Sequence, residues 1–457
     1  MKSPTFNHLY IQEKPDNDTR ERLRDYLVSS EREEPLVFAG RQDIRDYVQK
    51  KIEHLRRANK SLSSTIVVQG APGAGKTSLS KIIAKDMASD NELVVVSLPP
   101  AVFSDPASVL QGFISHEHVD FPELSRSHGR QGGGTLDAKV LKLNGPLSSQ
   151  LPSLAAMVEK SPTNLWGFAR TALTAGKELV FLLLVDEAQR LGVGEDVRAE
   201  QTVLSALHDG DHLADLKILP VFLGLSDTDT ALSRVGITRE AQDIFALGPL
   251  SHEESMYVVV STIRELGVEM SFKDEDIDRL GYQIGFACDG WPRHIHNYLQ
   301  ALVSEMEDCL EHGKTYLDLD KVLDEGHDNR IRFYSRRLSR IVGYDDLHKS
   351  LDLLAMKYEM NAEMGKADVF DHFMQATRND RDVGNGMITE CVHNGILQKF
   401  ENGNYGFSIP SLQAFLANGR DVEKTKEQLR NKVDEETGRV GAPDDGHMQG
   451  SKGGRVD

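Results

Sequence analysis

The 457-residue sequence is 39% hydrophobic and 27% charged, and its formal net charge is −18. A chain of this length can form two or three domains, and its acidic balance argues against a protein that coats nucleic acid electrostatically. Its three cysteines are far apart and have no histidine cluster at metal-ligand spacing, so a disulfide framework and a zinc site are not supported and a cytoplasmic setting is favoured. The longest apolar run, Leu179–Val185, is too short to cross a bilayer, so we expect no membrane partner.

The first part of the chain, residues 1–34, is charged and is predicted to be an arm that leads into the first domain. A short helix is expected over Arg20–Val28. An apolar turn follows and ends in Gly40-Arg41. The spacing of apolar residues then predicts a helix over Asp43–Arg57.

A glycine-rich turn between a short apolar strand and a helix start occupies Val67–Leu79. Gly70, Gly75, Lys76 and Thr77 stand at the G-x-x-x-x-G-K-[ST] spacing of phosphate-binding loops. The glycines let backbone N–H groups face an anion, and the following helix adds the positive end of its dipole. In such a loop the lysine reaches the β- and γ-phosphates and the threonine hydroxyl holds Mg²⁺. This stretch therefore predicts a nucleotide site.

The elements after this loop predict a parallel α/β sheet. A helix over Ser78–Met87 is followed by a buried strand over Leu93–Leu98. Residues 125–150 then interrupt the pattern with a glycine-rich, locally basic stretch. We interpret it as a surface insertion, with contact to nucleic acid or a partner as the alternative. A helix is predicted over Leu154–Ala175.

Two carboxylates follow a run of seven apolar residues, Leu179–Val185. The run predicts a fully buried strand, and Asp186 and Glu187 then emerge at the carboxyl edge of the sheet, where ligands of such folds bind. Asp186 is a candidate Mg²⁺ ligand, and Glu187 is a candidate for orienting and polarising the attacking water.

A further buried strand is predicted over Leu219–Leu225 and ends at Ser226. In an open sheet this end lies between the two earlier sites, so the Ser226 hydroxyl is a candidate hydrogen-bond partner of the γ-phosphate or of the attacking water. A short helix over Thr228–Val235 follows. The last strand is expected over Phe245–Leu250.

From Ser251 onward the pattern is helical. The third helix begins at Gly290-Trp291-Pro292-Arg293, with proline in the first turn. Helices are predicted over Glu253–Leu266, Asp274–Ala287, Pro292–Glu311 and Asp318–Arg337, with a loop over Thr315–Leu319. The densest basic cluster of the chain is interpreted as a solvated helix face and comprises Arg330, Arg332, Arg336, Arg337 and Arg340.

Residues 346–418 form another predicted unit. Three helices precede two short strands joined across Glu401–Asn404, a pattern typical of a winged helix. The unit carries six Lys or Arg against ten Asp or Glu, so contact with a protein or simple packing is at least as well supported as reading of a DNA groove. The tail from Asp421 begins as a charged helix, and disorder is expected from Gly438.

Residues 35–419 taken together resemble an AAA+ ATPase, and more narrowly the clade of origin-recognition and Cdc6-type ATPases with their bacterial relatives, such as the transposition ATPases. Gly70–Thr77 matches Walker A, and Val185–Gln189 is similar to Walker B of the bacterial members. Ser226 falls where the family places sensor 1, although the usual residue there is asparagine. Arg239 falls near the arginine finger, with Arg234 as its competitor. Gly290–Arg293 resembles sensor 2.

The resemblance implies an α/β P-loop core over residues 35–250, a helical lid over 251–340, a winged-helix domain over 341–419 and a charged, largely disordered tail over 420–457, after the arm of residues 1–34. It implies Mg-ATP as the ligand. Catalytic roles are expected for Lys76, Glu187, Ser226, Arg239 and Arg293, and metal ligation for Thr77 and Asp186. Nucleotide contacts are expected from Arg41, Gly70, Ala71, Pro72, Gly73, Ala74, Gly75, Lys76, Thr77 and Ser78.

Two functions fit these residues. The favoured one is an oligomeric ATPase that couples hydrolysis to remodelling of a protein or DNA partner, with DNA the more weakly supported of the two. The alternative is an ATP-dependent binding switch, for example in transposition or phage defence, in which hydrolysis is slow or incidental.

Overall fold

The computed structural model describes residues 8–28, 35–57, 64–88, 90, 92–114, 179–193, 197–205, 207, 217–341, 346–377 and 380–440. The insertion predicted at residues 125–150 and the helix predicted over Leu154–Ala175 lie outside them. Within the described part of the chain no helix is long and apolar enough to span a membrane.

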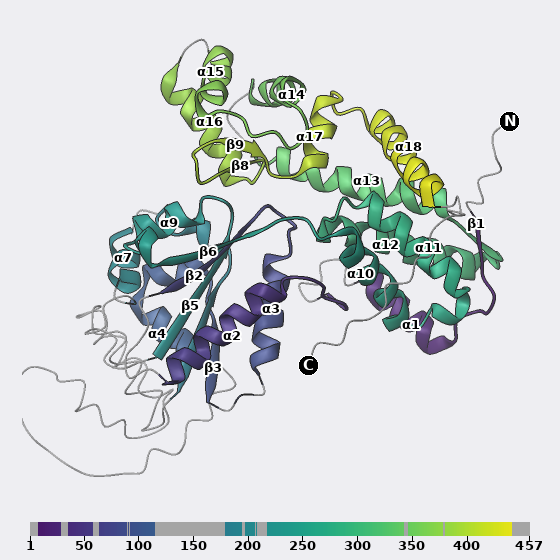
Figure 1. Ribbon diagram of the computed structural model, residues 1–457, viewed down its shortest axis with the longest axis horizontal. Coiled ribbons are helices and arrows are strands. Elements are labelled where there is room, and N and C mark those ends of the chain that lie inside the picture. Colours follow the sequence, from purple (N-terminus) through teal and green to yellow (C-terminus); the bar gives the residue numbers. More distant parts are fainter. Residues whose placement is uncertain are drawn as a thin grey trace, which may run out of the picture.

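A five-stranded parallel sheet forms the first part of the molecule, as the sequence predicts (Figure 1). The order of its strands is β3-β4-β5-β2-β6. The strands are β2 (Thr65–Gly70), β3 (Leu93–Ser97), β4 (Val180–Val185), β5 (Lys217–Gly224) and β6 (Gln242–Leu247). Because β5 pairs with both β2 and β4, its carboxyl end lies between the phosphate-binding loop and Asp186.

Helices cover both faces of the sheet, so successive residues of each central strand enter opposite cores. On β2, Ile66 and Val68 pack on one side and Val67 on the other. The first side is covered by α2 (Gln42–Arg57) and α3 (Lys76–Met87). The second side is covered by α4 (Pro106–Ile114), α7 (Val197–Ser205) and α9 (Thr228–Arg234), with short 3₁₀ turns η1 (Pro100–Ser104), η4 (Ala188–Arg190) and η5 (Arg239–Ala241) between elements.

A helical bundle follows the sheet and shares its core with the N-terminal arm. The bundle consists of α10 (His252–Glu265), α11 (Asp274–Ala287), α12 (Pro292–His312) and α13 (Leu319–Leu338), with the turn η6 (Glu269–Ser271). The arm supplies β1 (His8–Tyr10) and α1 (Asn17–Val28), and its Leu23 and Tyr26 are buried among bundle residues. The arm precedes the sheet domain in the chain, but its described residues pack on the bundle.

A strand also occupies part of the stretch predicted as a loop over Thr315–Leu319. It is β7 (Tyr316–Asp318), which pairs antiparallel with β1 and buries Leu317 against the bundle. A three-residue strand is too short to show an alternating pattern, and its partner lies at the other end of the chain. The sequence therefore carries no local signal for it.

The C-terminal unit, from α14 to α17, lies above both the sheet and the bundle in Figure 1. Its hairpin and helices fit either a lid or a winged helix. The elements are α14 (Leu347–Lys357), α15 (Lys366–Ala376), α16 (Arg381–His393), β8 (Leu397–Lys399), β9 (Tyr405–Phe407) and α17 (Pro410–Ala417). The tail helix α18 (Val422–Val440) returns to the bundle, where Leu429 and Val433 are buried, and it includes Gly438, where disorder is expected to begin.

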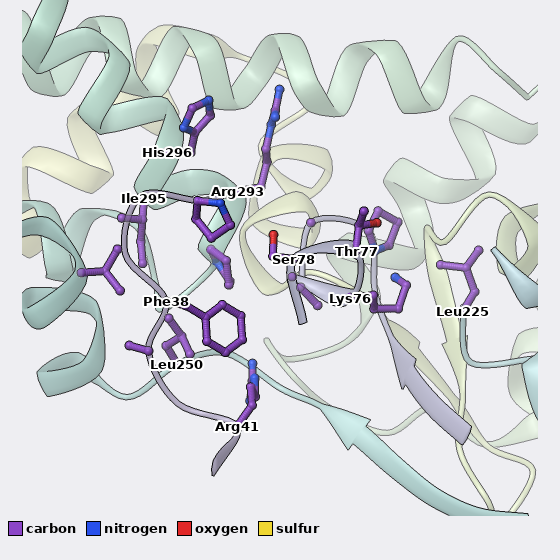
Figure 2. Close-up of a pocket in the computed structure, with 18 of the residues that line it drawn as sticks. Phe38, Arg41, Lys76, Thr77, Ser78, Leu225, Leu250, Arg293, Ile295 and His296 are labelled. Carbon is purple, nitrogen blue, oxygen red and sulfur yellow. The ribbon is translucent and has the colours of Figure 1, made fainter. Parts of the chain in front are cut away.

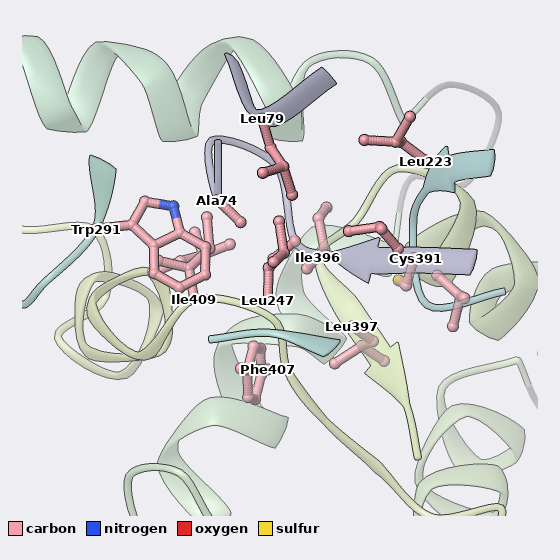
Figure 3. Close-up of a cluster of buried hydrophobic side chains, with 14 of the residues drawn as sticks. Ala74, Leu79, Leu223, Leu247, Trp291, Cys391, Ile396, Leu397, Phe407 and Ile409 are labelled. Carbon is pink, nitrogen blue, oxygen red and sulfur yellow. The ribbon is translucent and has the colours of Figure 1, made fainter. Parts of the chain in front are cut away.

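The C-terminal unit is fused to the sheet by one continuous apolar core (Figure 3). In that view Ile396 of the unit lies close to Leu247 at the end of β6, and Ala74 of the phosphate-binding loop belongs to the same core. The contact is close at Gly395, which has φ +65°, because a Cβ there would lie 2.5 Å from Cγ of Pro72.

Gly395→Ala is therefore expected to destabilise the protein more than Gly403→Ala does. Both glycines have positive φ, which costs an alanine about 1–2 kcal/mol, but Gly403 has no atom within 4 Å of the added Cβ. The clash with Pro72 adds about 1–3 kcal/mol of overpacking. Thermal unfolding of both variants measures the difference, and equal losses would show that the Gly395 contact is loose.

Candidate nucleotide-binding site

The predicted phosphate-binding loop joins the end of β2 to the start of α3. Gly73 and Gly75 have φ of +79° and +92°, a conformation that favours glycine. Gly73 is also closely approached, since a Cβ there would lie 2.7 Å from Cβ of Arg293 in α12. The loop therefore needs glycine at this position for its backbone conformation and for the space that the helical bundle occupies.

Lys76 is buried at the first position of α3. Its Nζ donates to the carbonyl oxygens of Gly70 at 2.7 Å and Ala71 at 3.1 Å, so the ammonium folds back over the loop. Burial lowers the pKa of Lys76 to about 8, against the opposing charges of Asp186 and Glu187. An anion placed in the loop would offset this cost of burial.

Thr77 and Asp186 meet across the carboxyl edge of the sheet. The Thr77 hydroxyl donates to Oδ2 of Asp186 at 2.5 Å, and Oδ1 of Asp186 accepts the N–H of Glu187 at 2.8 Å. One hydroxyl and one carboxylate fit Mg²⁺, which is usually held by few protein groups together with waters and phosphate oxygens. No cluster of three or more His, Cys, Asp or Glu side chains that could hold a metal is found among the described residues.

Glu187 follows Asp186 in a left-handed backbone conformation, with φ 57°. Its carboxylate is half-exposed, lines the cavity, accepts from Nε2 of Gln189 at 2.9 Å and pairs with Arg190 at 3.3 Å. Gln189 is buried, and its Oε1 accepts the N–H of Leu225 at 3.2 Å. Gln189 thus ties the ends of β4 and β5 together and holds Glu187, a role that the sequence does not reveal.

The helical bundle is docked on the phosphate-binding loop. Nε1 of the buried Trp291 donates to the Pro72 carbonyl at 3.0 Å, and the Arg293 N–H donates to the Gly73 carbonyl at 3.2 Å. Pro292 is the first residue of α12, so these contacts fix the start of that helix over the loop. Figure 2 shows Arg293 near Ser78, with Thr77 on the far side of Ser78.

A cavity of about 780 Å³ opens between the loop, the bundle and the C-terminal unit. Its described lining contains one carboxylate, Glu187, and six cationic side chains. The cations are Arg41, Lys76, Arg190, Arg293, Arg337 and Arg340. This balance favours a polyanionic ligand.

One end of the cavity is apolar. Phe38, Leu250 and Ile295 lie around it in Figure 2. Arg41 borders this end and donates to the Gly248 carbonyl, and burial lowers its pKa. The arm also reaches the cavity, where Oη of Tyr26 lies 3.2 Å from Nδ1 of His296. Nothing in the sequence near Tyr26 signals this role.

Three other candidates lie elsewhere. Ser226 does not line the cavity, and its hydroxyl accepts the N–H of Lys399 from the C-terminal unit at 3.1 Å. Arg239 begins η5, is half-exposed and lies 3.5 Å from Glu401 of the same unit. Arg234 ends α9 and packs its Cβ near Gly192. Neither arginine lines the cavity of its own chain.

The predicted solvated arginine face divides into three groups. Arg332 and Arg336 are exposed, as expected. Arg330 is 5% exposed and donates to the Ala287 carbonyl and to Asp289, so the interpretation is wrong for it. It is also incomplete for Arg337 and Arg340, which line the cavity.

Comparison with known proteins agrees with the fold. A family model described as the KAP family P-loop domain matches residues 44–118, and no curated protein matches the sequence significantly. A Walker-type ATPase of Pyrococcus abyssi superposes with a TM-score of 0.50 at 13% identity, over 83% of this chain and 96% of that one. The ORC2 protein of Aeropyrum pernix gives a TM-score of 0.48 at 13% identity, over 91% and 98%. Cdc6p of Pyrobaculum aerophilum gives 0.40 at 12% identity, over 86% and 96%. The superposition on the Pyrococcus abyssi ATPase shows a shared fold.

Proposed function

We propose that this protein is an ATPase of AAA+ type that binds Mg-ATP in the cavity and hydrolyses it. The observation that carries the proposal is the contact between Thr77 and Asp186, which joins the phosphate-binding loop to the acidic end of β4 beside the buried Lys76. Two motifs far apart in the sequence thus form one site. The cationic lining of the cavity suits a triphosphate, and its apolar end suits a purine.

The roles follow from these positions. The loop and Lys76 would bind the phosphates, and Arg293 would neutralise their charge from the bundle. Thr77 and Asp186 would hold Mg²⁺, which neutralises charge that develops on the phosphate oxygens. Glu187 would orient the attacking water and accept its proton. Among the described residues it is the one carboxylate that lines the cavity, and it is open to solvent.

We further propose that hydrolysis is coupled to assembly and to a protein partner. Arg239 is exposed and does not line its own cavity, as expected of a residue supplied to a neighbouring subunit. The acidic C-terminal unit favours a protein over DNA. A salt-titrated DNA-binding assay with and without ATP tests this choice, and salt-sensitive binding of DNA would overturn it.

A binding switch with slow hydrolysis is the second candidate. It is favoured by the packing of the C-terminal unit on the loop through Gly395 and Pro72, and by the contacts of Ser226 and Arg239 with that unit. In that case ATP would change the packing of the unit and so expose a binding surface. Slow ATP turnover together with ATP-dependent capture of a partner would distinguish the switch from an ATPase whose hydrolysis drives remodelling.

Lys76→Ala is expected to weaken ATP binding about 100-fold, because charge-assisted hydrogen bonds to the phosphates are lost. Titration calorimetry with ATP measures the effect. Lys85→Ala, an exposed lysine on the same helix, is the control and should bind as wild type. Unchanged affinity in Lys76→Ala would contradict the site.

A further inference from the structure

Arg337 lies in the last turn of α13, in a cluster that the sequence assigns to a solvated face. It lines the cavity, and its Cζ lies 5.1 Å from the centre of the Phe333 ring. Its Nη1 donates to the Asn394 carbonyl at 3.1 Å, and its Nε is buried and has no hydrogen-bond partner among the described residues. The side chain is thus held by the bundle and the C-terminal unit and still has donors to offer.

The charges around Arg337 favour binding of an anion at this place. Burial and the charge of Arg340 lower the pKa of Arg337 to about 10, and Arg293 acts in the same direction. The charge of Glu187 raises the pKa of Arg337, whereas that of Arg337 lowers the pKa of Lys76. Lys76, Glu187 and Arg337 all line the same cavity, in which the terminal phosphate is expected.

The carbonyl that Arg337 holds belongs to the segment that packs on the phosphate-binding loop. Asn394 is the last residue before Gly395, whose backbone lies against Pro72, and His393 and Asn394 both line the cavity. Movement of the Arg337 guanidinium would therefore shift the backbone at the end of α16. Because a guanidinium binds phosphate more strongly than a neutral carbonyl, a terminal phosphate bound at the remaining donors would draw the guanidinium away from the Asn394 carbonyl.

We propose that Arg337 binds the terminal phosphate of the nucleotide and that doing so loosens the packing of Asn394 and Gly395 on the loop. The proposal rests on the nucleotide site proposed above and adds a second arginine of the bundle to Arg293. In this proposal the contact needs the terminal phosphate, so with a diphosphate bound Arg337 keeps its hydrogen bond to Asn394. The difference between the two nucleotides is thereby converted into a difference in packing at Gly395.

The test compares ADP with a non-hydrolysable ATP analogue in the full-length protein. In Arg337→Ala, affinity for the analogue is expected to fall about 10- to 100-fold, the effect of losing a charge-assisted hydrogen bond, while affinity for ADP changes less than about threefold. Arg337→Lys keeps the charge but loses the planar guanidinium, so its affinity for the analogue should lie between those of wild type and Arg337→Ala. Arg336→Ala, its exposed neighbour, should match wild type. An unchanged ratio in Arg337→Ala, or an equal loss in Arg336→Ala, would overturn the assignment.

Hydrogen exchange over residues 386–399 tests the coupling. In wild type the analogue should raise exchange above the level with ADP, and in Arg337→Ala the two nucleotides should give the same exchange. The same nucleotide response in both proteins would overturn the coupling. Lys76→Ala separates the two proposals: if it binds ATP as wild type does, the nucleotide site itself is wrong, whereas if it fails to bind and Arg337→Ala is normal, only the role of Arg337 is wrong.

Discussion

Glu187→Gln is expected to lower the rate of ATP hydrolysis about 10²- to 10⁴-fold, the usual effect of removing a general base, and to leave ATP affinity near that of wild type. The carboxylate is half-exposed beside the Thr77–Asp186 pair, so it can accept a proton from a water at the terminal phosphate. Glutamine keeps the shape of the side chain and loses that basicity. The protein should therefore bind ATP and retain it.

Single-turnover hydrolysis and ATP titration measure the two effects separately. Glu92→Gln, at an exposed position before β3, is the matched control and should hydrolyse ATP as wild type does. Turnover by Glu187→Gln within threefold of wild type would contradict the assignment of the base. A parallel loss of binding would instead indicate that Glu187 is needed for the shape of the site, since its backbone has positive φ.

The elements that form the sheet were predictable because their signals are local. The run before Asp186 is apolar over its full length, and β4 is buried on both faces. The phosphate-binding loop needs glycines at fixed offsets, and Gly73 and Gly75 have positive φ. Such constraints act within a few residues, so the printed sequence displays them directly.

Contacts between distant segments could not be predicted in the same way. The place of Ser226 after β5 predicts a contact with the phosphates, yet its hydroxyl accepts the N–H of Lys399, which lies in a different unit. Tyr26 reaches the cavity because the arm packs on the bundle, and no pattern near it reports that docking. For Arg330 and Arg337, charge alone predicts exposure. Their burial depends on segments distant in the sequence, which pack around them in the folded chain.

Replacement of Arg239 is expected to have the second large effect on the rate of ATP hydrolysis. Arg239 and Glu401 are both well exposed and 3.5 Å apart, so their ion pair is worth at most about 1 kcal/mol. A neighbouring subunit can therefore displace Glu401 at little cost. An arginine supplied in trans to a phosphoryl-transfer site is worth about 10³- to 10⁵-fold in rate. Arg239→Ala should lose that factor and keep ATP affinity.

The concentration dependence of the ATPase rate tests whether Arg239 acts between subunits. Specific activity of wild type should rise with protein concentration as subunits assemble, and that of Arg239→Ala should stay low throughout. Arg234→Ala is the matched control, since Arg234 is the competing candidate. A flat wild-type profile together with full activity in Arg239→Ala would overturn the trans role, and a loss confined to Arg234→Ala would transfer it to Arg234.

Mixing two inactive variants gives the sharper result. Arg239→Ala subunits keep Glu187, and Glu187→Gln subunits keep Arg239. When the two meet, an intact arginine from the second can complete a site that has an intact carboxylate in the first, so activity should reappear on mixing. Recovery cannot occur if both residues act within one chain, because every chain in the mixture then lacks one of them. Mixed samples that stay inactive although the subunits assemble would therefore place Arg239 outside the neighbouring site.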